Sequence, residues 1–177
     1  MKIKVLRLNK GIDMPTIIDK GDWIDLRLSQ ETTFKAPYAT MLKRKKDNDE
    51  IERTRNVIFD FKLLSLGVAI KLPDGFEAMI LPRSSTFKKY GILQANSEGV
   101  VDNTYCGDSD EWKLPAIAFN DVTIPANERI CQFRIQLSQK ATLWQKLKWL
   151  FSNKIELVEV DHLSDKNRDG FGSTDKQ

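Results

Sequence analysis

The chain has 177 residues, 41% of them hydrophobic and 30% charged, which is enough to bury a core in one domain and excludes a disordered or fibrous protein. Its 28 basic and 25 acidic residues leave a net charge of +3, too small a bias to indicate direct nucleic-acid binding, and no apolar run is long enough to span a membrane. Two cysteines are typical of a reduced, cytoplasmic protein. The single histidine argues against a multi-histidine zinc site and against a Ser-His-Asp triad.

Short apolar segments separated by turn residues recur along most of the chain. Strands are predicted over residues 2–8, 23–28, 58–64, 68–70, 76–81, 90–93, 99–101, 116–119 and 130–135. Pro73-Asp74-Gly75 predicts a turn between two of them. Many short strands at nearly regular spacing predict a mainly β protein, built as a sandwich, barrel or jelly roll.

The segment 37–56 differs in composition from its surroundings. Four basic residues, 43–46, are followed by Asp47-Asn48-Asp49-Glu50, and blocks of like charge usually lie in solvent. We therefore expect an exposed loop or short helix. The alternative is an insertion that binds a partner or attracts phosphate.

One segment, near 141–152, has helical periodicity. The apolar stripe consists of Leu143, Trp144, Leu147, Leu150 and Phe151. Lysines lie between these residues, and Trp149 falls off the stripe. The period predicts an amphipathic helix whose stripe packs against the β core. A partner surface is the alternative, and a membrane-surface helix is disfavoured because only a few turns are available.

Two stretches carry residues suited to a phosphorylated ligand with a base-like edge. Arg83-Ser84-Ser85 offers a forked guanidinium and small hydroxyl donors, which suit phosphate oxygens. Asn96 places a donor beside an acceptor, and Gly99 permits close approach of a ligand to the backbone. Asp102 ends an apolar strand, where its carboxylate could accept a proton from water, and Tyr105 could reach the same pocket. The alternative is a hairpin in which Asn and Asp only make turns.

The C-terminal segment 164–177 is polar, with one aromatic residue, Phe171. Glycines on both sides of Phe171 are typical of a flap that becomes ordered on a ligand. Ser173, Thr174 and the adjacent backbone amides could form an anion-binding nest. The alternative is an ordinary disordered C-terminus.

Taken in chain order, these stretches resemble the five motifs of the homotrimeric dUTPase family. The matching residues are Asp25-Leu26, Pro82-Arg83-Ser84, Asn96 with Gly99 to Asp102, Tyr105 and Gly107, Glu128 to Gln132, and Arg168 with Gly170-Phe171-Gly172-Ser173-Thr174. Any one motif is weak evidence, and the five in order carry the resemblance. Ser85 stands where a glycine is usual, and Arg168 lies closer to Phe171 than in many members. The added segments are similar to those of phage-encoded members.

The resemblance implies a mainly β, antiparallel jelly roll, the dUTPase-like β-clip, with one added amphipathic helix. It implies a β domain over 1–163, with insertions near 37–56 and 109–114, and a flexible catalytic flap over 164–177. It also implies a homotrimer with active sites between subunits. The reaction implied is hydrolysis of dUTP to dUMP and pyrophosphate, with Mg²⁺ on the triphosphate. That reaction limits uracil incorporation into DNA and supplies dUMP for thymidylate synthesis.

Each motif residue receives a role from the same resemblance. Asp102 activates the attacking water, Tyr105 packs on the deoxyribose and leaves no room for a 2′-hydroxyl, and Asp25 lies near the water shell of the metal. The residues implied to bind uracil are Asn96, Gly99, Val100, Val101 and, by stacking, Phe171. The remaining substrate-binding residues, most of them at the phosphates, are Arg83, Ser84, Ser85, Gln132, Arg168, Gly172, Ser173 and Thr174.

Two alternatives of other classes stay open. A dCTP deaminase has the same fold and can share the Arg-Ser-Ser motif, but Ile117 occupies the place of its required glutamate, which leaves Glu111 as the possible substitute. Tyr105 also stands where that enzyme usually has Trp. The second alternative is a nucleotide-sensing regulatory protein that binds a protein partner through its insertions, and the features behind it are the basic run 43–46 and the tryptophans of the helix near 141–152.

Overall fold

The computed structural model describes residues 1–17, 21–45, 51–151, 154–168 and 170. The elements of this part of the chain are, in order, β1 (Lys2–Arg7), β2 (Thr16–Ile17), β3 (Ile24–Arg27), β4 (Thr32–Phe34), β5 (Tyr38–Lys45), β6 (Ile51–Ile58), β7 (Phe61–Ser65), β8 (Val68–Lys71), β9 (Phe76–Pro82), α1 (Thr86–Tyr90), β10 (Ile92–Gln94), β11 (Gly99–Asp102), β12 (Lys113–Ala118), β13 (Val122–Ile124), β14 (Arg129–Leu137), α2 (Leu143–Phe151) and β15 (Glu156–Glu159). The prediction of a mainly β protein is confirmed. No helix in these ranges is long and apolar enough to cross a membrane.

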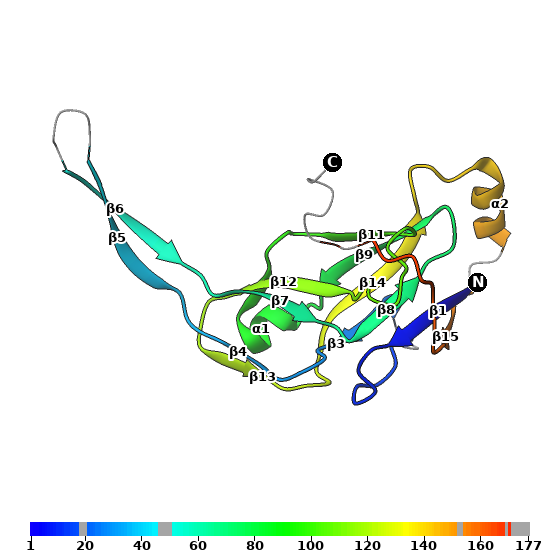
Figure 1. Cartoon of the computed structure of the whole chain (residues 1–177), viewed down its shortest axis with the longest axis horizontal. Helices are drawn as coiled ribbons and strands as arrows, with labels where there is room; N and C mark the ends of the chain where they lie inside the picture. The colour runs from blue at the N-terminus through cyan, green and yellow to red at the C-terminus, as the bar shows by residue number, and fades with distance from the viewer. Residues whose placement is uncertain (18–20, 46–50, 152–153, 169, 171–177) are drawn as a thin grey trace.

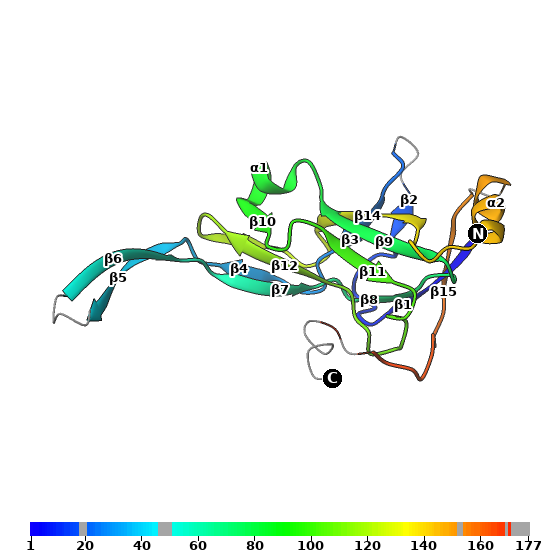
Figure 2. The same cartoon turned by 90° about the horizontal axis from the view of Figure 1, so that it is seen from above.

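Five strands form the sheet that carries the predicted site residues Asp25, Gly99 to Asp102 and Gln132, in the order β11-β9-β14-β3-β2. Two three-stranded sheets, β15-β1-β8 and β10-β12-β7, pack with it around the core (Figures 1 and 2). In β9, Phe76, Ala78 and Ile80 are buried and alternate with half-buried residues, which is the two-residue period of a strand with one face in the core. Trp112 is fully buried and lies edge-on to Phe133 of β14, with ring centroids 5.1 Å apart.

The described residues of the segment 37–56 are mostly strand, so the prediction of a loop or short helix is wrong for them. β5 and β6 pair antiparallel from Tyr38 opposite Ile58 to Lys45 opposite Ile51, and the resulting ribbon projects from the body of the protein (Figures 1 and 2). The expected exposure is confirmed, since neither strand has a buried residue. A ribbon with solvent on both faces has no need of alternating apolar residues, and the strand period is therefore missing from its sequence.

A short helix replaces the start of the strand predicted over 90–93. α1 ends at Tyr90, and Gly91 follows in the left-handed region with a φ of 64°. The Gly91 amide donates to the carbonyl of Phe87 at 2.7 Å and closes the helix. A Cβ at Gly91 would lie 1.7 Å from Asn120 Oδ1, so both conformation and space require glycine here.

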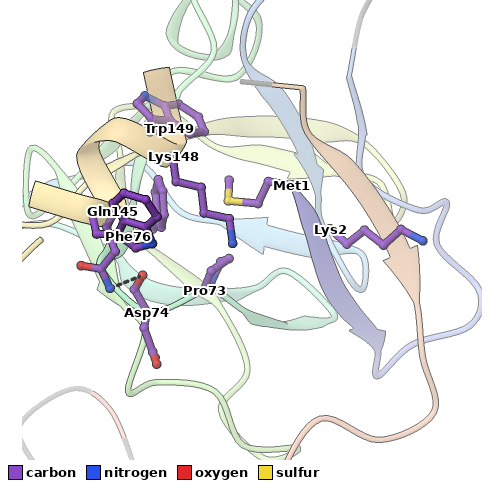
Figure 3. Close-up of a pocket in the computed structure, with 9 residues that line it drawn as sticks. Met1, Lys2, Pro73, Asp74, Phe76, Gln145, Lys148 and Trp149 are labelled. Carbon is purple, nitrogen blue, oxygen red and sulfur yellow. Dashed lines mark hydrogen bonds between the residues drawn. The ribbon is translucent and has the colours of Figure 1, made fainter. Parts of the chain in front are cut away.

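The helix predicted near 141–152 is confirmed as α2. Thr142 and Gln145 form its N-terminal capping box: the Thr142 amide donates to Gln145 Oε1 at 2.7 Å, and the Gln145 amide donates to Thr142 Oγ1 at 3.3 Å. Gln145 Nε2 also donates to the Asp74 carbonyl at 3.1 Å, which ties the helix to the turn between β8 and β9 (Figure 3). A pocket of about 440 Å³ lies between α2, this turn and the start of β1.

The predicted orientation of α2 is wrong. The apolar stripe faces solvent, with Trp144 78% and Phe151 84% exposed. The helix instead contacts the body through Trp149, which lies off the stripe and packs edge-on against Phe76 with ring centroids 5.2 Å apart. The contacts of Gln145 and Trp149 with the β8–β9 turn occupy the opposite side of the helix, and this directs the stripe outward.

Replacing Trp149 or Trp144 of α2 by alanine should distinguish the observed orientation of the helix from the one expected from its apolar stripe. Trp149→Ala removes half of an aromatic pair and should lower the free energy of unfolding by about 1–2 kcal/mol, less than the 3–5 kcal/mol of a fully buried ring. Trp144→Ala should stay within about 0.5 kcal/mol of the unsubstituted protein, as exposed positions do. Urea unfolding of both variants at one protein concentration measures this. A larger loss of unfolding free energy in Trp144→Ala than in Trp149→Ala would instead support the orientation in which the apolar stripe packs on the core.

Candidate active site

The predicted site residues form two clusters at opposite ends of β9. Gln132 of β14 pairs with Leu81 near the C-terminal end of β9 and with Asp25 of β3. Asp102 of β11 instead pairs with Glu77, near the N-terminal end of β9. Pro82 lies five residues after Glu77 in the sequence, which is about 17 Å along a strand. One chain therefore holds two incomplete sets of predicted site residues.

The first cluster is organised by a buried carboxylate. Asp25 is 2% exposed, with Oδ1 2.9 Å from Arg83 Nε and Oδ2 3.1 Å from Arg129 Nη1. Gln132 Nε2 donates to the Pro82 carbonyl at 3.5 Å, beside Arg83 in the sequence. Two guanidinium groups on one side chain offset the cost of burying it and hold Arg83 in place, while Arg83 stays partly exposed. Such a fixed cation suits phosphate oxygens.

Two serine hydroxyls follow Arg83 at the surface. Ser84 and Ser85 are exposed, and the Ser85 side chain makes no capping hydrogen bond to α1. Thr86 is buried, and its hydroxyl donates to the Ile130 carbonyl of β14 at 2.7 Å, which fixes the start of the helix. Next to Gln132, burial raises the pKa of the Cys131 thiol, so this cysteine is no nucleophile.

The second cluster centres on the carboxylate of Asp102. Its Oδ1 accepts from the Thr104 amide at 2.8 Å and from the Thr104 hydroxyl at 2.5 Å. Its Oδ2 accepts from Arg168 Nη1 at 2.6 Å. Partial burial by itself raises the pKa of the Asp102 carboxyl, but the hydrogen bonds from Thr104 and Arg168 outweigh it and hold that pKa below its ordinary value. Asp102 is therefore ionised at neutral pH and able to accept a proton.

Tyr105 lies beside this carboxylate and against the C-terminal segment. Its hydroxyl donates to the Glu111 carbonyl at 2.9 Å. A Cβ on Gly170 would be 3.2 Å from the Tyr105 ring, so the backbone of the C-terminal segment passes close to the aromatic side chain. The Tyr105 amide donates to the Asp102 carbonyl at 3.2 Å, so Asp102, Tyr105 and Arg168 lie in one region of the structure, while their roles stay predictions.

The residues predicted to read uracil lie on an exposed sheet edge. β11 is the terminal strand of its sheet, so one side of its backbone is directed away from β9. Asn96 precedes this strand, and its Oδ1 accepts from Gln94 Nε2 at 2.9 Å. Gly99 packs tightly on β9, where a Cβ would be 3.3 Å from Ile80 Cβ. Edge amides and carbonyls between Gly99 and Val101 suit recognition of a base edge by hydrogen bonds.

Comparison with known proteins agrees with this arrangement. The dUTPase family model matches residues 52–148. The SPbeta prophage-derived deoxyuridine 5′-triphosphate nucleotidohydrolase YosS of Bacillus subtilis is 38% identical over 174 residues, and the match covers 98% of each chain. The chain belongs to the dUTPase family. The deoxyuridine 5′-triphosphate nucleotidohydrolase of Hydrogenobaculum is also 38% identical, over 66% of this chain and 72% of the relative.

Solved dUTPase structures share the fold. The dUTPase of Streptococcus mutans matches with a TM-score of 0.56 and 18% identity, over 73% of this chain and 92% of the other. The Staphylococcus bacteriophage 80alpha dUTPase matches with a TM-score of 0.55 and 15% identity, over 97% and 96% of the two chains. The prediction of a dUTPase-like jelly roll is confirmed, and so is the resemblance to phage-type members.

The donor set fits a metal that arrives with the substrate. The described residues hold no group of three or more His, Cys, Asp or Glu side chains able to bind a metal ion. Both oxygens of Asp25, the predicted indirect ligand, face guanidinium groups. Because Mg²⁺ keeps several waters and binds mainly through substrate phosphates, no resident carboxylate cluster is needed.

Several residues with clear roles escaped the sequence analysis. Thr104 is one, and the only available signal was its position two residues after Asp102, which equally predicts a simple turn. Asp110 is another: it is 1% exposed and accepts from the backbone amide of Arg168 at 2.9 Å. Arg129 belongs to a matched motif, but nothing in the sequence shows that it shares Asp25 with Arg83. The predicted residues Phe171, Gly172, Ser173 and Thr174 lie outside the described residues.

Replacing Thr104 by valine should move the acid limb of the pH profile. Valine keeps the shape but removes the hydroxyl, so the pKa of Asp102 rises toward its ordinary value. Since a base must be ionised to act, kcat/KM for dUTP then falls at a higher pH than in the unsubstituted enzyme. Thr104→Ser keeps the hydroxyl and should keep the limb in place. If the acid limb of the valine variant lies at the same pH as in the unsubstituted enzyme, the Thr104 hydroxyl does not lower the pKa of Asp102.

Proposed function

We propose that this protein hydrolyses dUTP to dUMP and pyrophosphate. The observation that carries the proposal is an ionised Asp102 beside Tyr105 on an edge strand, in a chain whose relatives are named dUTP nucleotidohydrolases. Cleavage of a phosphoanhydride depends mainly on positioning and charge neutralisation, so one base and several cations suffice. The reaction limits uracil incorporation into DNA and supplies dUMP. Two free cysteines support a reducing, cytoplasmic location.

In this mechanism the chain divides the work between its two clusters. Asp102 accepts the proton of the attacking water through the oxygen that Thr104 leaves free. The edge of β11 with Asn96 reads uracil, and the Tyr105 ring packs on the deoxyribose. Phosphate oxygens bind the fixed Arg83 guanidinium, the hydroxyls of Ser84 and Ser85 and, through water, Gln132. Arg168 joins them when its guanidinium leaves Asp102.

The C-terminal residues and the metal complete the proposed site. Phe171 would stack on uracil, and Gly172, Ser173 and Thr174 would bind phosphates through amides and hydroxyls. The flap over 164–177 stays a prediction for residues 171–177. Mg²⁺ would bind the triphosphate and neutralise developing charge, with Asp25 reached only through water.

The two clusters support a homotrimer with sites between subunits. About 17 Å of strand β9 separates Asp102 from the Arg83 cluster within one chain, and β9 is paired along both sides. A neighbouring copy that places its Arg83 cluster against the Asp102 cluster supplies both halves of a site. In a closed ring of three copies every chain gives and receives one cluster.

A substrate panel tests the reaction. Phosphate and ammonia release should be measured with dUTP, dCTP, dTTP and UTP, after adding inorganic pyrophosphatase to split the pyrophosphate. We expect phosphate from dUTP alone at a substantial rate, and no ammonia. Asp102→Asn should lose on the order of 10²-fold or more in kcat with nucleotide binding retained, because the amide cannot accept a proton. Turnover within a few-fold of the unsubstituted enzyme would remove Asp102 from the role of base.

Mixed assemblies test the division between subunits. Asp102→Asn and Arg83→Ala chains should each be nearly inactive alone. Mixed in equal amounts, unfolded and reassembled, they should regain activity at about a quarter of the sites, because each intact site takes Asp102 from one chain and Arg83 from its neighbour. A mixture no more active than its parents would place the complete site in one chain.

The two alternatives receive less support. Glu111 is the substitute expected for a deaminase. Its carboxylate accepts from the Ser65 hydroxyl and from the Gly67 amide at 3.0 Å, so these hydrogen bonds support a structural role for it. The relatives described above are named nucleotidohydrolases and not deaminases. A protein partner at the β5–β6 ribbon or at α2 stays a prediction, compatible with hydrolysis.

A further inference from the structure

The loop after the Asp102 motif is bound to the C-terminal segment by a series of hydrogen bonds. Asp108 Oδ1 accepts from the Leu163 amide at 2.7 Å, and the Asp108 amide donates to the Ser164 carbonyl at 3.2 Å. The Ser109 amide donates to Asn167 Oδ1 at 2.9 Å. Residues 163–167 are therefore held along this loop by contacts within the chain itself. Nothing in the hydrolytic mechanism itself requires these bonds.

Asp110 is the buried end of this series. Its oxygens accept from the Arg168 amide at 2.9 and 3.1 Å and from the Gly107 amide at 2.8 Å. A carboxylate that is 1% exposed costs free energy unless hydrogen bonds compensate it, and here one backbone donor comes from its own loop and one from the distant C-terminal segment. Gly107 makes room for the arrangement, because a Cβ there would lie 2.1 Å from Asn167 Oδ1.

Arg168 is consequently held at two independent points. Its amide is fixed by Asp110, while its Nη1 lies 2.6 Å from Asp102 Oδ2 and 2.7 Å from Thr104 Oγ1. The guanidinium contacts are partly exposed, and the amide contact is buried. The side chain can therefore rotate away from Asp102 while the backbone stays in place.

We propose that Asp110 is a positioning residue that fixes the backbone of Arg168, so that its guanidinium caps Asp102 at rest and reaches the substrate phosphates by side-chain rotation alone. The inference rests on the proposed dUTP hydrolysis. It gives the insertion near 109–114 a role that its sequence does not reveal. Fixing the backbone in advance removes most of the ordering cost of placing a flexible cation on the triphosphate.

Hydrogen exchange at the Arg168 amide tests the anchor directly. Asp110→Asn keeps the size of the side chain but turns one acceptor into a donor that faces two amides. Exchange at Arg168 should accelerate by about tenfold or more, the factor expected for a lost charge-assisted hydrogen bond. Asp161→Asn is the matched control, since Asp161 loses the same charge and its side chain is fully exposed; exchange and turnover should not change. Unchanged exchange in Asp110→Asn would overturn the proposal.

A double-mutant cycle separates positioning from a merely structural role. Asp110→Asn should lower kcat/KM about tenfold or more in the unsubstituted background, but have little further effect once Arg168 is alanine, because both changes remove one function. Equal losses in both backgrounds would show that Asp110 only supports the loop. If Asp110→Asn does not fold, Asn167→Ala removes the exposed acceptor of the Ser109 amide, and the same non-additivity with Arg168→Ala is expected at smaller amplitude.

Turnover of dUTP by the unsubstituted enzyme distinguishes failure of the proposed function from failure of the proposed role of Asp110. If it does not hydrolyse dUTP, the proposed function fails, while exchange at Arg168 still reports on the anchor. If it is active and the cycle is additive, the function stands and the role of Asp110 is overturned.

Discussion

Strand β9 fixes the distance between the two clusters of predicted site residues. It pairs with β11 on one side and with β14 on the other, and its buried residues Phe76, Ala78 and Ile80 alternate with more exposed ones. A slip of one residue would turn the buried set to the other face, so the register cannot drift. The rigid strand thereby keeps Asp102 apart from the Arg83 cluster. This separation is what supports the proposed homotrimer, in which a neighbouring copy supplies the other cluster.

Asp25, Asp110 and Asp102 differ in burial, and the two buried carboxylates have a different role from the more exposed one. Asp25 and Asp110 are almost fully buried, and each accepts from partners that are far away in the sequence. A buried carboxylate costs free energy unless cations or hydrogen-bond donors compensate it, so each fixes the segments that supply them: Arg83 and Arg129 in one case, the C-terminal segment in the other. Asp102 is more exposed, and Thr104 occupies only one of its oxygens. The other oxygen accepts from Arg168, and it is the oxygen to which the proposed mechanism assigns the proton of water.

The sequence predicts what depends on short-range pattern. Strands with one buried face carry a two-residue period, and the five motifs keep their order, so the β fold and the family could be predicted. The face of α2 that meets the body depends on Phe76 and the turn before it, about 70 residues away, and no helical period contains that information. The β5–β6 ribbon has no buried face and so lacks the strand period. Nothing in the local sequence distinguishes Asp110 from other loop aspartates, because its role depends on the amide of Arg168, a residue distant in the sequence.

The pairing of Arg168 with Asp102 links exposure of the base to arrival of the substrate. The ion pair is about as exposed as surface pairs that contribute about 0.2–1 kcal/mol, so it covers the carboxylate without holding the guanidinium firmly. A triphosphate carries several negative charges within reach of the same guanidinium and competes effectively for it. In the proposed mechanism the guanidinium turns to the phosphates, and the hydrogen bonds from Thr104 still favour the ionised form of Asp102, which can then accept a proton from water. The base is thus uncovered by the ligand whose hydrolysis it serves.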